Sequence, residues 1–335
     1  MELSKFIDKK PFVIAGPCSA ESEKQALKIA NDIKDTTDVF RAGIWKPRTR
    51  SNSFEGIGKE ALTWMQKVKQ KTKLKVSTEV ATAKHVELCL ESGIDMLWIG
   101  ARTTVNPFYV QEIAEALSGV DIPVFVKNPI HPELSLWIGA LERLNKKGIK
   151  NLAAIHRGFF TYESSAFRNE PKWEIPIELK RQLPNLPIIC DPSHIAGNKT
   201  LIPEISQIAM DLDMNGLMIE THNNPSEALS DSAQQITPIK LKSILDNLVL
   251  RKKKFEDDIL SFELNILRKK IDKLDQNIVE KLNLRTELVE EIAQFKLKNN
   301  LTIFQLERWF EILYKRREQS IKLEMDPKMV RDIFE

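Results

Sequence analysis

The sequence predicts an α/β fold, a closed (β/α)8 barrel of the TIM type followed by a small all-α helical domain. Over the first three quarters of the chain, short apolar runs rich in β-branched residues alternate with amphipathic stretches. This is the pattern of repeated strand–helix units. All twelve glycines lie at or before Gly216, so the end of the chain is built differently. We expect a barrel over residues 1–250, a linker over 251–257 and a helical domain over 258–335.

The composition agrees with two domains and excludes several kinds of partner. The 335 residues are 42% hydrophobic and 29% charged, enough to bury a large core. A formal net charge of +3 is too balanced to indicate nucleic acid or a membrane surface. No apolar run approaches the roughly 18 residues of a membrane helix, and the first residues do not resemble a signal peptide. With three cysteines far apart in the sequence, we expect a reduced, cytoplasmic protein without a disulfide framework.

Eight apolar runs are the candidate strands. They cover residues 12–15, 39–45, 75–78, 96–100, 123–126, 152–155, 187–190 and 216–219. Continuous apolar runs suit parallel strands that are buried on both faces, and eight of them with helices between suit a closed barrel. An open, doubly wound sheet is the alternative.

Metal-binding residue types follow several of these runs, at the end of a barrel where active sites lie. They are Cys18, His194, Glu220 and Asp231. They can converge because the last strand of a closed barrel lies beside the first. One thiolate, one imidazole and two carboxylates suit Mn²⁺, Fe²⁺, Zn²⁺ or Co²⁺ better than Mg²⁺ or Ca²⁺. The alternative is a buried cysteine, a hydrogen-bonded histidine and two solvated carboxylates.

Cations form a second group at the strand ends. They are Arg41, Lys46, Arg48, Arg102, Lys127 and Arg157. Six cations around one cavity would repel one another unless anions bind there, and both residue types recognise carboxylates and phosphates. Two phosphorylated substrates would account for the number. The alternative is a set of surface salt bridges with acidic neighbours such as Glu21 and Glu79.

The motifs at these strand ends resemble those of the 3-deoxy-D-arabino-heptulosonate 7-phosphate (DAHP) synthases. They are G-P-C-S-A-E-S at 16–22, K-P-R-T at 46–49, G-A-R at 100–102, H-R-G at 156–158, D-P-S-H at 191–194 and A-L-S-D at 228–231. The resemblance covers essentially residues 1–250. The K-P-R-T motif discriminates best, because the related 3-deoxy-octulosonate 8-phosphate synthases carry a different motif there.

The resemblance implies condensation of phosphoenolpyruvate with erythrose 4-phosphate and water, giving DAHP and phosphate on the pathway to aromatic amino acids. It implies that Cys18, His194, Glu220 and Asp231 bind a divalent metal, with Mn²⁺ as the first candidate. The residues implied to hold phosphoenolpyruvate are Arg41, Lys46, Arg102, Lys127 and Arg157. Those implied to hold erythrose 4-phosphate are Arg48 and Thr49. The implied catalytic residues are Lys46, Glu79, Lys127 and His194. A sugar-phosphate aldolase or isomerase is the alternative, and it would not need phosphoenolpyruvate.

The glycine-free end predicts long helices. Apolar residues recur at intervals of three and four over residues 260–282, which indicates an amphipathic helix that ends near Asn299. A second helix is expected from about Gln305, and Asp326 followed by proline is a start signal for a third. Because one long helix cannot bury its apolar stripe alone, we expect a homodimer through this domain, or a tetramer built from such dimers.

Polar residues of this helical end resemble those of the all-helical chorismate mutases over residues 258–335. The residues implied to bind chorismate or prephenate are Arg268, Arg285, Lys296, Gln305 and Arg308. The chain ends before a complete third helix would supply the family's Ser and Gln, so we expect this domain to be short at its C-terminal end. Two hypotheses follow. The domain either rearranges chorismate to prephenate, or only dimerises, senses these compounds and regulates the barrel.

Overall fold

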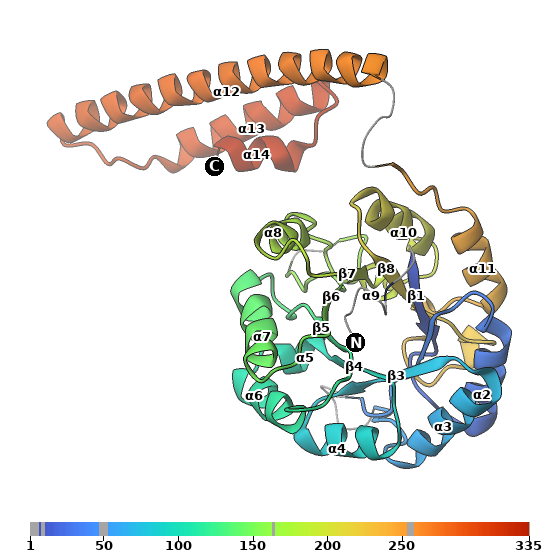
Figure 1. The fold of residues 1–335 in the computed structure, drawn as a ribbon. Coiled ribbons are helices and arrows are strands. Elements are labelled where there is room, and N and C mark those ends of the chain that lie inside the picture. Colours follow the sequence, from blue (N-terminus) through green and yellow to red (C-terminus); the bar gives the residue numbers. More distant parts are fainter. Residues whose placement is uncertain (1–6, 8–10, 47–52, 163–164, 253–257, 335) are drawn as a thin grey trace. The chain divides into compact units, whose positions relative to one another are not determined.

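The computed structural model describes residue 7 and residues 11–46, 53–162, 165–252 and 258–334. The chain forms two compact units, Met1–Arg251 and Lys252–Glu335. In the first unit, parallel strands close into a ring in the order β1 to β8, with β8 paired to β1 (Figure 1). This confirms the predicted fold class, and the open sheet is wrong.

The described strands match the predicted runs to within a few residues at their ends. Their bounds are β1 (Phe12–Gly16), β2 (Val39–Arg41), β3 (Lys75–Val80), β4 (Met96–Ile99), β5 (Val124–Lys127), β6 (Leu152–His156), β7 (Ile188–Cys190) and β8 (Gly216–Glu220). The largest difference is in β2, which ends at Arg41 although the apolar run continues. Beyond this end, Gly43 forms only an isolated parallel bridge with Ser19, in which its N–H donates to the carbonyl of Cys18 at 3.2 Å.

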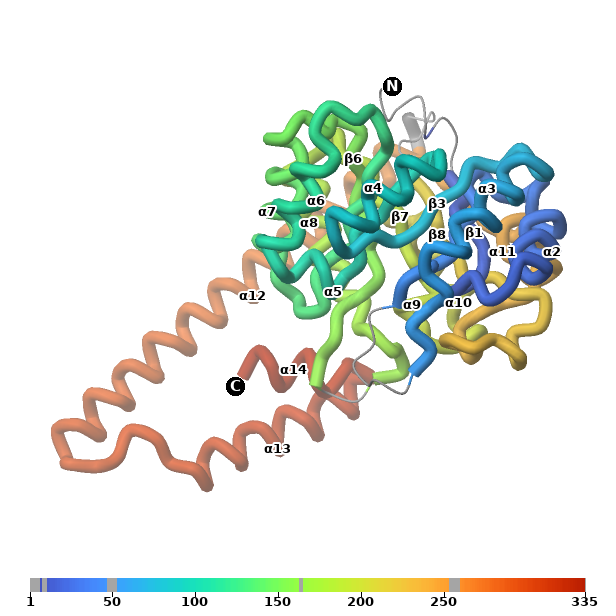
Figure 2. Tube along the Cα trace, turned by 90° about the horizontal axis from the view of Figure 1, so that it is seen from below, coloured from blue at the N-terminus to red at the C-terminus, as the bar shows by residue number. Residues whose placement is uncertain are grey.

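Helices surround the ring of strands and follow them along the chain. The α-helices are α2 (Glu23–Ile33), α3 (Glu60–Thr72), α4 (Ala83–Glu91), α5 (Ala101–Thr104), α6 (Pro107–Ala116), α7 (Leu134–Lys146), α8 (Glu174–Gln182), α9 (Pro192–Ala196), α10 (Ile202–Asp211) and α11 (Pro238–Asp246). Two 3-10 turns are η1 (Pro225–Glu227) and η2 (Ser232–Gln234). Ser22 and Thr82 cap α2 and α4 by accepting backbone N–H bonds. Seen from below, α3, α2 and α11 lie together on one side of the barrel (Figure 2).

The barrel core has two layers, which follow from the alternation of side chains along each strand. Outward-facing residues pack against the helices, while inward-facing residues such as Ile14, Phe125 and Met218 fill the interior. Two positions after Phe125 and Met218, on the same inward face, come Lys127 and Glu220. The apolar interior is therefore covered by a polar layer at the carboxyl ends of the strands.

The second unit consists of α12 (Asp258–Lys298), α13 (Leu306–Lys322) and α14 (Pro327–Phe334). These bounds agree with the helix ends expected from the sequence. Many apolar side chains of α12 are exposed, including Leu267 (56%), Leu274 (60%) and Ile278 (55%). In the part of the chain that the structure describes, no helix is both long and apolar enough to cross a membrane.

Candidate functional site

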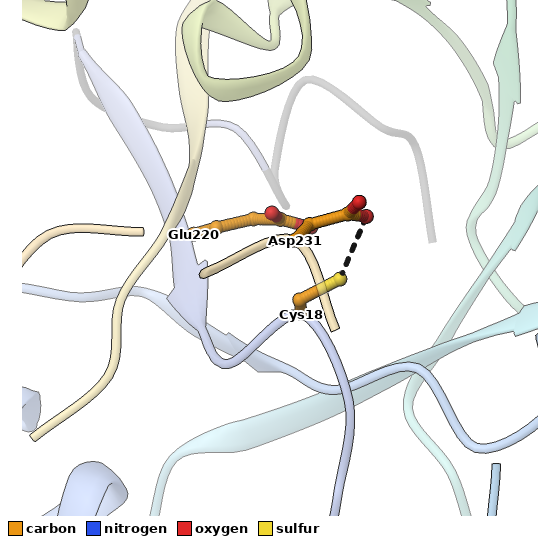
Figure 3. Close-up of side chains that lie close together, drawn as sticks. All are labelled: Cys18, Glu220 and Asp231. Atoms are coloured by element: carbon orange, nitrogen blue, oxygen red, sulfur yellow. Dashed lines mark hydrogen bonds between the residues drawn. The ribbon is translucent and has the colours of Figure 1, made fainter. Parts of the chain in front are cut away.

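Three of the four predicted metal ligands converge at the junction of the first and last strands. The pairing of β1 with β8 sets Gly16 beside Glu220, and Cys18 follows β1 by two residues. Potential ligand atoms of Cys18, Glu220 and Asp231 all lie within 4.8 Å of one another. Figure 3 shows these side chains together, with Sγ of Cys18 donating to Oδ2 of Asp231 at 3.3 Å. One sulfur and two carboxylates fit a divalent transition metal.

The fourth predicted ligand, His194, lies at the edge of this cluster. It is carried by α9, whose N-cap is Asp191. Nε2 of His194 lies 3.9 Å from Oε1 of Glu220, and Nδ1 lies 2.8 Å from Oδ2 of Asp191. In metal sites, a histidine commonly bonds to a carboxylate through one ring nitrogen, which orients the other nitrogen toward the metal.

Two predicted phosphoenolpyruvate ligands contact the cluster instead of the open pocket. The Arg41 guanidinium lies 3.2 Å from Oε1 of Glu220 and donates to the Cys18 carbonyl at 3.0 Å. Lys46 donates from Nζ to Sγ of Cys18 at 2.8 Å. These cations balance the charge of the acidic groups in the cluster.

Burial and charge determine the protonation of the cluster. Burial, with the Glu220 charge next, raises the pKa of the Cys18 thiol to about 12, although Lys46 and Arg41 oppose this. Burial also favours the neutral form of Glu220, but His194, Arg41 and Lys46 outweigh it and lower the pKa of that carboxyl. The carboxylates are thus ready to bind a cation, and a bound divalent ion would favour the Cys18 thiolate.

A pocket of about 310 Å³ opens beside His194. The predicted residues that line it are Glu79, Arg102, Lys127, Arg157 and His194. Burial lowers the pKa of Arg157 from 12.5 to about 10, so this guanidinium remains protonated at neutral pH. Arg168 also lines the pocket, and a pocket with four cations that lies next to a candidate metal ligand suits an anionic substrate.

Asp191 joins the pocket to the candidate metal cluster. Its buried carboxylate accepts from Nζ of Lys127 at 2.9 Å and lies 2.8 Å from the His194 ring. Burial alone would raise the pKa of Asp191, but His194 and Lys127 hold it well below its ordinary range. No role was predicted for Asp191, although it begins the D-P-S-H motif.

Trp98 is a second residue that sequence analysis missed. It is fully buried, and its indole N–H donates to Oε2 of Glu79 at 2.9 Å. The Arg41 guanidinium lies over its ring, 4.9 Å from the centroid, and Nζ of Lys127 lies 5.9 Å from the centroid. An apolar residue in a strand ordinarily indicates core. The signal available in the sequence was the even spacing of Trp98 from the inward-facing Met96.

Arg48 and Thr49, the predicted ligands of erythrose 4-phosphate, lie outside the described residues. Arg168 and Asn169 were not predicted, yet both line the pocket. Gln234, also unpredicted, donates to Glu220 at 2.7 Å. No periodic pattern marks these three residues, because they lie in loops and in a single 3-10 turn.

The five predicted residues of the helical unit contact close neighbours. Arg268 donates to Asn265 at 3.4 Å, and Lys296 donates to the Ile303 carbonyl at 2.8 Å. Arg308 pairs with Glu311 along α13. Arg285 lies over the ring of Phe334, 5.3 Å from its centroid, and Gln305 is the N-cap residue of α13. These described contacts do not bring the five side chains into one pocket.

Known proteins match both units. Residues 5–255 match the model of the DAHP synthetase I family, and residues 267–335 match that of chorismate mutase type II. The chain is 28% identical over 225 residues to a phospho-2-dehydro-3-deoxyheptonate aldolase of Thermotoga maritima, a match that covers 67% of this chain and 64% of that protein. The chain thus spans less than two thirds of that relative's length.

Two further similarities concern a related enzyme and a solved structure. A 2-dehydro-3-deoxyphosphooctonate aldolase of Vesicomyosocius okutanii is 27% identical over 290 residues, covering 74% of this chain and 95% of that protein. The crystal structure of the Thermotoga maritima DAHP synthase superposes with a TM-score of 0.62 at 27% identity, over 70% of this chain and 67% of that one. The predicted resemblances, to a DAHP synthase and to a chorismate mutase, are both confirmed. The chain belongs to the DAHP synthetase I family and carries a chorismate mutase type II domain after its barrel.

Proposed function

We propose that the barrel condenses phosphoenolpyruvate with erythrose 4-phosphate and water to give DAHP and phosphate. The observation that carries this proposal is the pocket of about 310 Å³, in which Arg102, Lys127 and Arg157 lie beside His194. Phosphoenolpyruvate carries a carboxylate and a phosphate, so these three cations and Arg168, which also lines the pocket, suit its charge. Arg41 and Lys46 would complete the anion site once a metal takes over the charge balance of the cluster.

Cys18, His194, Glu220 and Asp231 are the proposed ligands of a divalent metal, with Mn²⁺ as the first candidate. The mixed sulfur, nitrogen and oxygen donors support a transition metal. When bound, the ion supplies a Lewis acid that polarises the aldehyde oxygen of erythrose 4-phosphate. In the condensation, the methylene carbon of phosphoenolpyruvate attacks the aldehyde carbon, whose oxygen takes up a proton. Water adds at the neighbouring carbon, and the resulting hemiketal phosphate releases phosphate to leave the ketone of DAHP.

Glu79 and Lys127 are the proposed groups for proton transfer with that water. Both line the pocket, so a carboxylate and an ammonium face the same bound substrate. Lys46 is assigned to the same chemistry from its position beside Cys18, where Nζ can donate a proton toward the reacting groups. Arg48 and Thr49 remain the proposed ligands of the erythrose 4-phosphate phosphate group.

The test uses the full chain after removal of bound metal. We expect no phosphate release from phosphoenolpyruvate and erythrose 4-phosphate in chelator, recovery with Mn²⁺, and little activity in Cys18→Ala. Full activity in chelator would refute the metal assignment. Turnover without phosphoenolpyruvate would support a sugar-phosphate aldolase or isomerase. Since an octulosonate product needs five carbons from the aldose, a five-carbon aldose phosphate should be the poorer substrate.

For the helical unit, we propose rearrangement of chorismate to prephenate, with Arg268, Arg285, Lys296, Gln305 and Arg308 as ligands. The match to chorismate mutase type II supports this activity over a purely sensing role. Cations can hold the dicarboxylate in its reactive conformer and stabilise charge on the ether oxygen. Chorismate consumption by the full chain tests it. No turnover, together with a change in DAHP formation on adding chorismate or prephenate, would favour the sensor.

We further propose that the chain forms a homodimer through residues 258–335, with residues 1–250 as the barrel and 251–257 as the linker. The exposed apolar residues of α12 support pairing, because a second copy can cover them. A partner helix could also bring cations from two chains to one chorismate site.

We also propose a cytoplasmic location. The cysteines Cys18, Cys89 and Cys190 are free and buried, which fits a reduced, cytoplasmic compartment.

A further inference from the structure

Two side chains outside the proposed ligand set hold its carboxylates. Gln234, only 1% exposed, donates its amide nitrogen to Oε2 of Glu220 at 2.7 Å. Its amide oxygen accepts from Nη1 of Arg168 at 2.6 Å. The same nitrogen of Arg168 donates to Oδ1 of Asp231 at 3.1 Å. A continuous chain of hydrogen bonds therefore joins Glu220 to Asp231 through Gln234 and Arg168.

Arg168 and Gln234 each donate to one oxygen of a carboxylate whose other oxygen lies toward the cluster. Oδ1 of Asp231 accepts from Arg168, while Oδ2 accepts from Sγ of Cys18. Oε2 of Glu220 accepts from Gln234, while Oε1 accepts from Nη1 of Arg41 at 3.2 Å and lies 3.9 Å from Nε2 of His194. Gln234, together with Arg41, thus fixes which oxygen of Glu220 faces the proposed metal, as Arg168 does for Asp231.

The backbone of Arg168 is hydrogen-bonded to α9, the helix that carries His194. The N–H of Arg168 donates to the Ala196 carbonyl at 3.3 Å, at the last turn of α9. Gly197, which follows α9, has a φ of +69°, and a Cβ there would lie 2.3 Å from Cβ of Arg168. Arg168 is therefore positioned against α9 as well as against the two carboxylates.

Asn169 extends this arrangement to the anion pocket. Its Nδ2 donates to the His194 carbonyl at 2.7 Å, and its Oδ1 accepts from Nη1 of Arg157 at 2.8 Å. Consecutive residues of one loop thus bond to the pocket, to α9 and to the residues after β8. A loop that contacts all three parts can hold them at fixed positions relative to one another.

We propose that Arg168 and Gln234 are positioning residues for the divalent cation, orienting Asp231 and Glu220. This inference rests on the proposed metal site. Hydrogen bonds from outside a ligand set commonly change metal affinity by about 10- to 100-fold when they are removed. Arg168 is itself a cation and repels a metal ion, so its charge alone would weaken binding. The positioning role and the charge effect therefore predict opposite results when Arg168 is replaced.

The experiment compares full-length, metal-stripped wild type with Arg168→Met and Gln234→Met by calorimetric titration with Mn²⁺. We expect the Kd for Mn²⁺ to rise about 10- to 100-fold in both variants. The electron paramagnetic resonance spectrum of bound Mn²⁺ should broaden, since the ligand geometry becomes less uniform. Excess Mn²⁺ should restore much of the kcat. Arg181→Met is the matched control, because Arg181 is exposed and pairs only with Glu178 in the described structure.

An unchanged or lower Kd in Arg168→Met would overturn the proposal. The Arg168 side chain is 44% exposed, so this variant tests the idea even if Gln234→Met does not fold. Failure of the proposed function gives a different result. In that case wild type itself would not bind one Mn²⁺ per chain, and Asp231→Asn would titrate like wild type.

Discussion

At the residue scale, Trp98 illustrates how a buried aromatic residue can serve chemistry. Its ring belongs to the inner core of the barrel, while its N–H reaches the Glu79 carboxylate that lines the pocket. Gly100 helps, because a Cβ there would lie 2.2 Å from Oε1 of Glu79. The Trp98 hydrogen bond therefore holds the carboxylate in a space that Gly100 leaves open.

We predict that Trp98→Phe lowers kcat by about 10- to 100-fold and changes the KM for phosphoenolpyruvate much less, because a misdirected Glu79, the proposed proton-transfer group, would lose part of its contribution. Steady-state kinetics measure this. Trp137→Phe is the control, since Trp137 is equally buried but donates to the Val126 carbonyl. Equal losses in both variants would mean that general destabilisation is responsible.

His156 gives a second residue-scale prediction, for stability against pH. It is fully buried among the rings of Trp137, Phe159 and Trp173, and burial, followed by the charge of Arg157, lowers its pKa from 6.5 to about 3. Between these values the unfolded chain binds the proton more readily, so stability falls as pH falls. By pH 5 the loss should be about 2 kcal/mol.

Urea unfolding of the barrel at pH 7 and pH 5 measures this loss. His156→Leu should show a smaller difference between the two pH values than wild type, because its side chain does not titrate. Replacement of the exposed His131 by leucine is the control and should keep the wild-type difference. The same pH dependence in wild type and His156→Leu would contradict the prediction.

At the element scale, the placement of α9 depends on Gly197. This residue ends the helix in the left-handed region, and the Arg168 side chain occupies the space where a Cβ would lie. We predict that Gly197→Ala destabilises the barrel by about 2–4 kcal/mol, from backbone strain and overpacking together, and weakens Mn²⁺ binding.

Gly93→Ala separates the two causes. Gly93 has a similar φ of +65°, but a Cβ at this position would have no atom within 4 Å of it. The substitution should cost only the backbone strain of about 1–2 kcal/mol and leave the Kd for Mn²⁺ unchanged. Thermal unfolding and Mn²⁺ titration of both variants provide the measurement. Equal effects on Mn²⁺ binding would show that Gly197 does not act through Arg168.

At the scale of the whole molecule, the helical unit leaves its apolar stripe uncovered. Leu274 and Ile278 lie one turn apart on α12 and are more than half exposed. We predict that Leu274→Glu combined with Ile278→Glu lowers the oligomeric state, since two charges would be buried in the pairing surface. Sedimentation velocity measures it. Lys281→Glu, on the same helix, should leave the assembly intact, and an unchanged mass in the double variant would contradict pairing through this stripe.

Much of the fold, and part of the candidate site, follows from the periodicity of apolar residues in the sequence. Alternation predicts which strand residues face inward, and two positions beyond an inward apolar residue lie Arg41, Lys127 and Glu220. Closure of eight strands brings the first and last together, so Cys18 and Glu220 meet although they are far apart in the sequence. The end of α12 at Lys298 and the start of α14 at Pro327 followed from local stop and start signals. Local patterns were sufficient for these features because they depend on strand and helix geometry.

The amino-acid sequence by itself determined the barrel, the helical end and the residue types at the barrel mouth. Only the tertiary structure decided which of those residues contact one another. It set Arg41 and Lys46 against the candidate metal cluster, Trp98 beneath Glu79, and Arg168 with Gln234 behind the carboxylates. The physical reason is that such partners come from loops joined to different strands. A hydrogen bond between them depends on distances across the barrel, which no periodic pattern in the chain encodes.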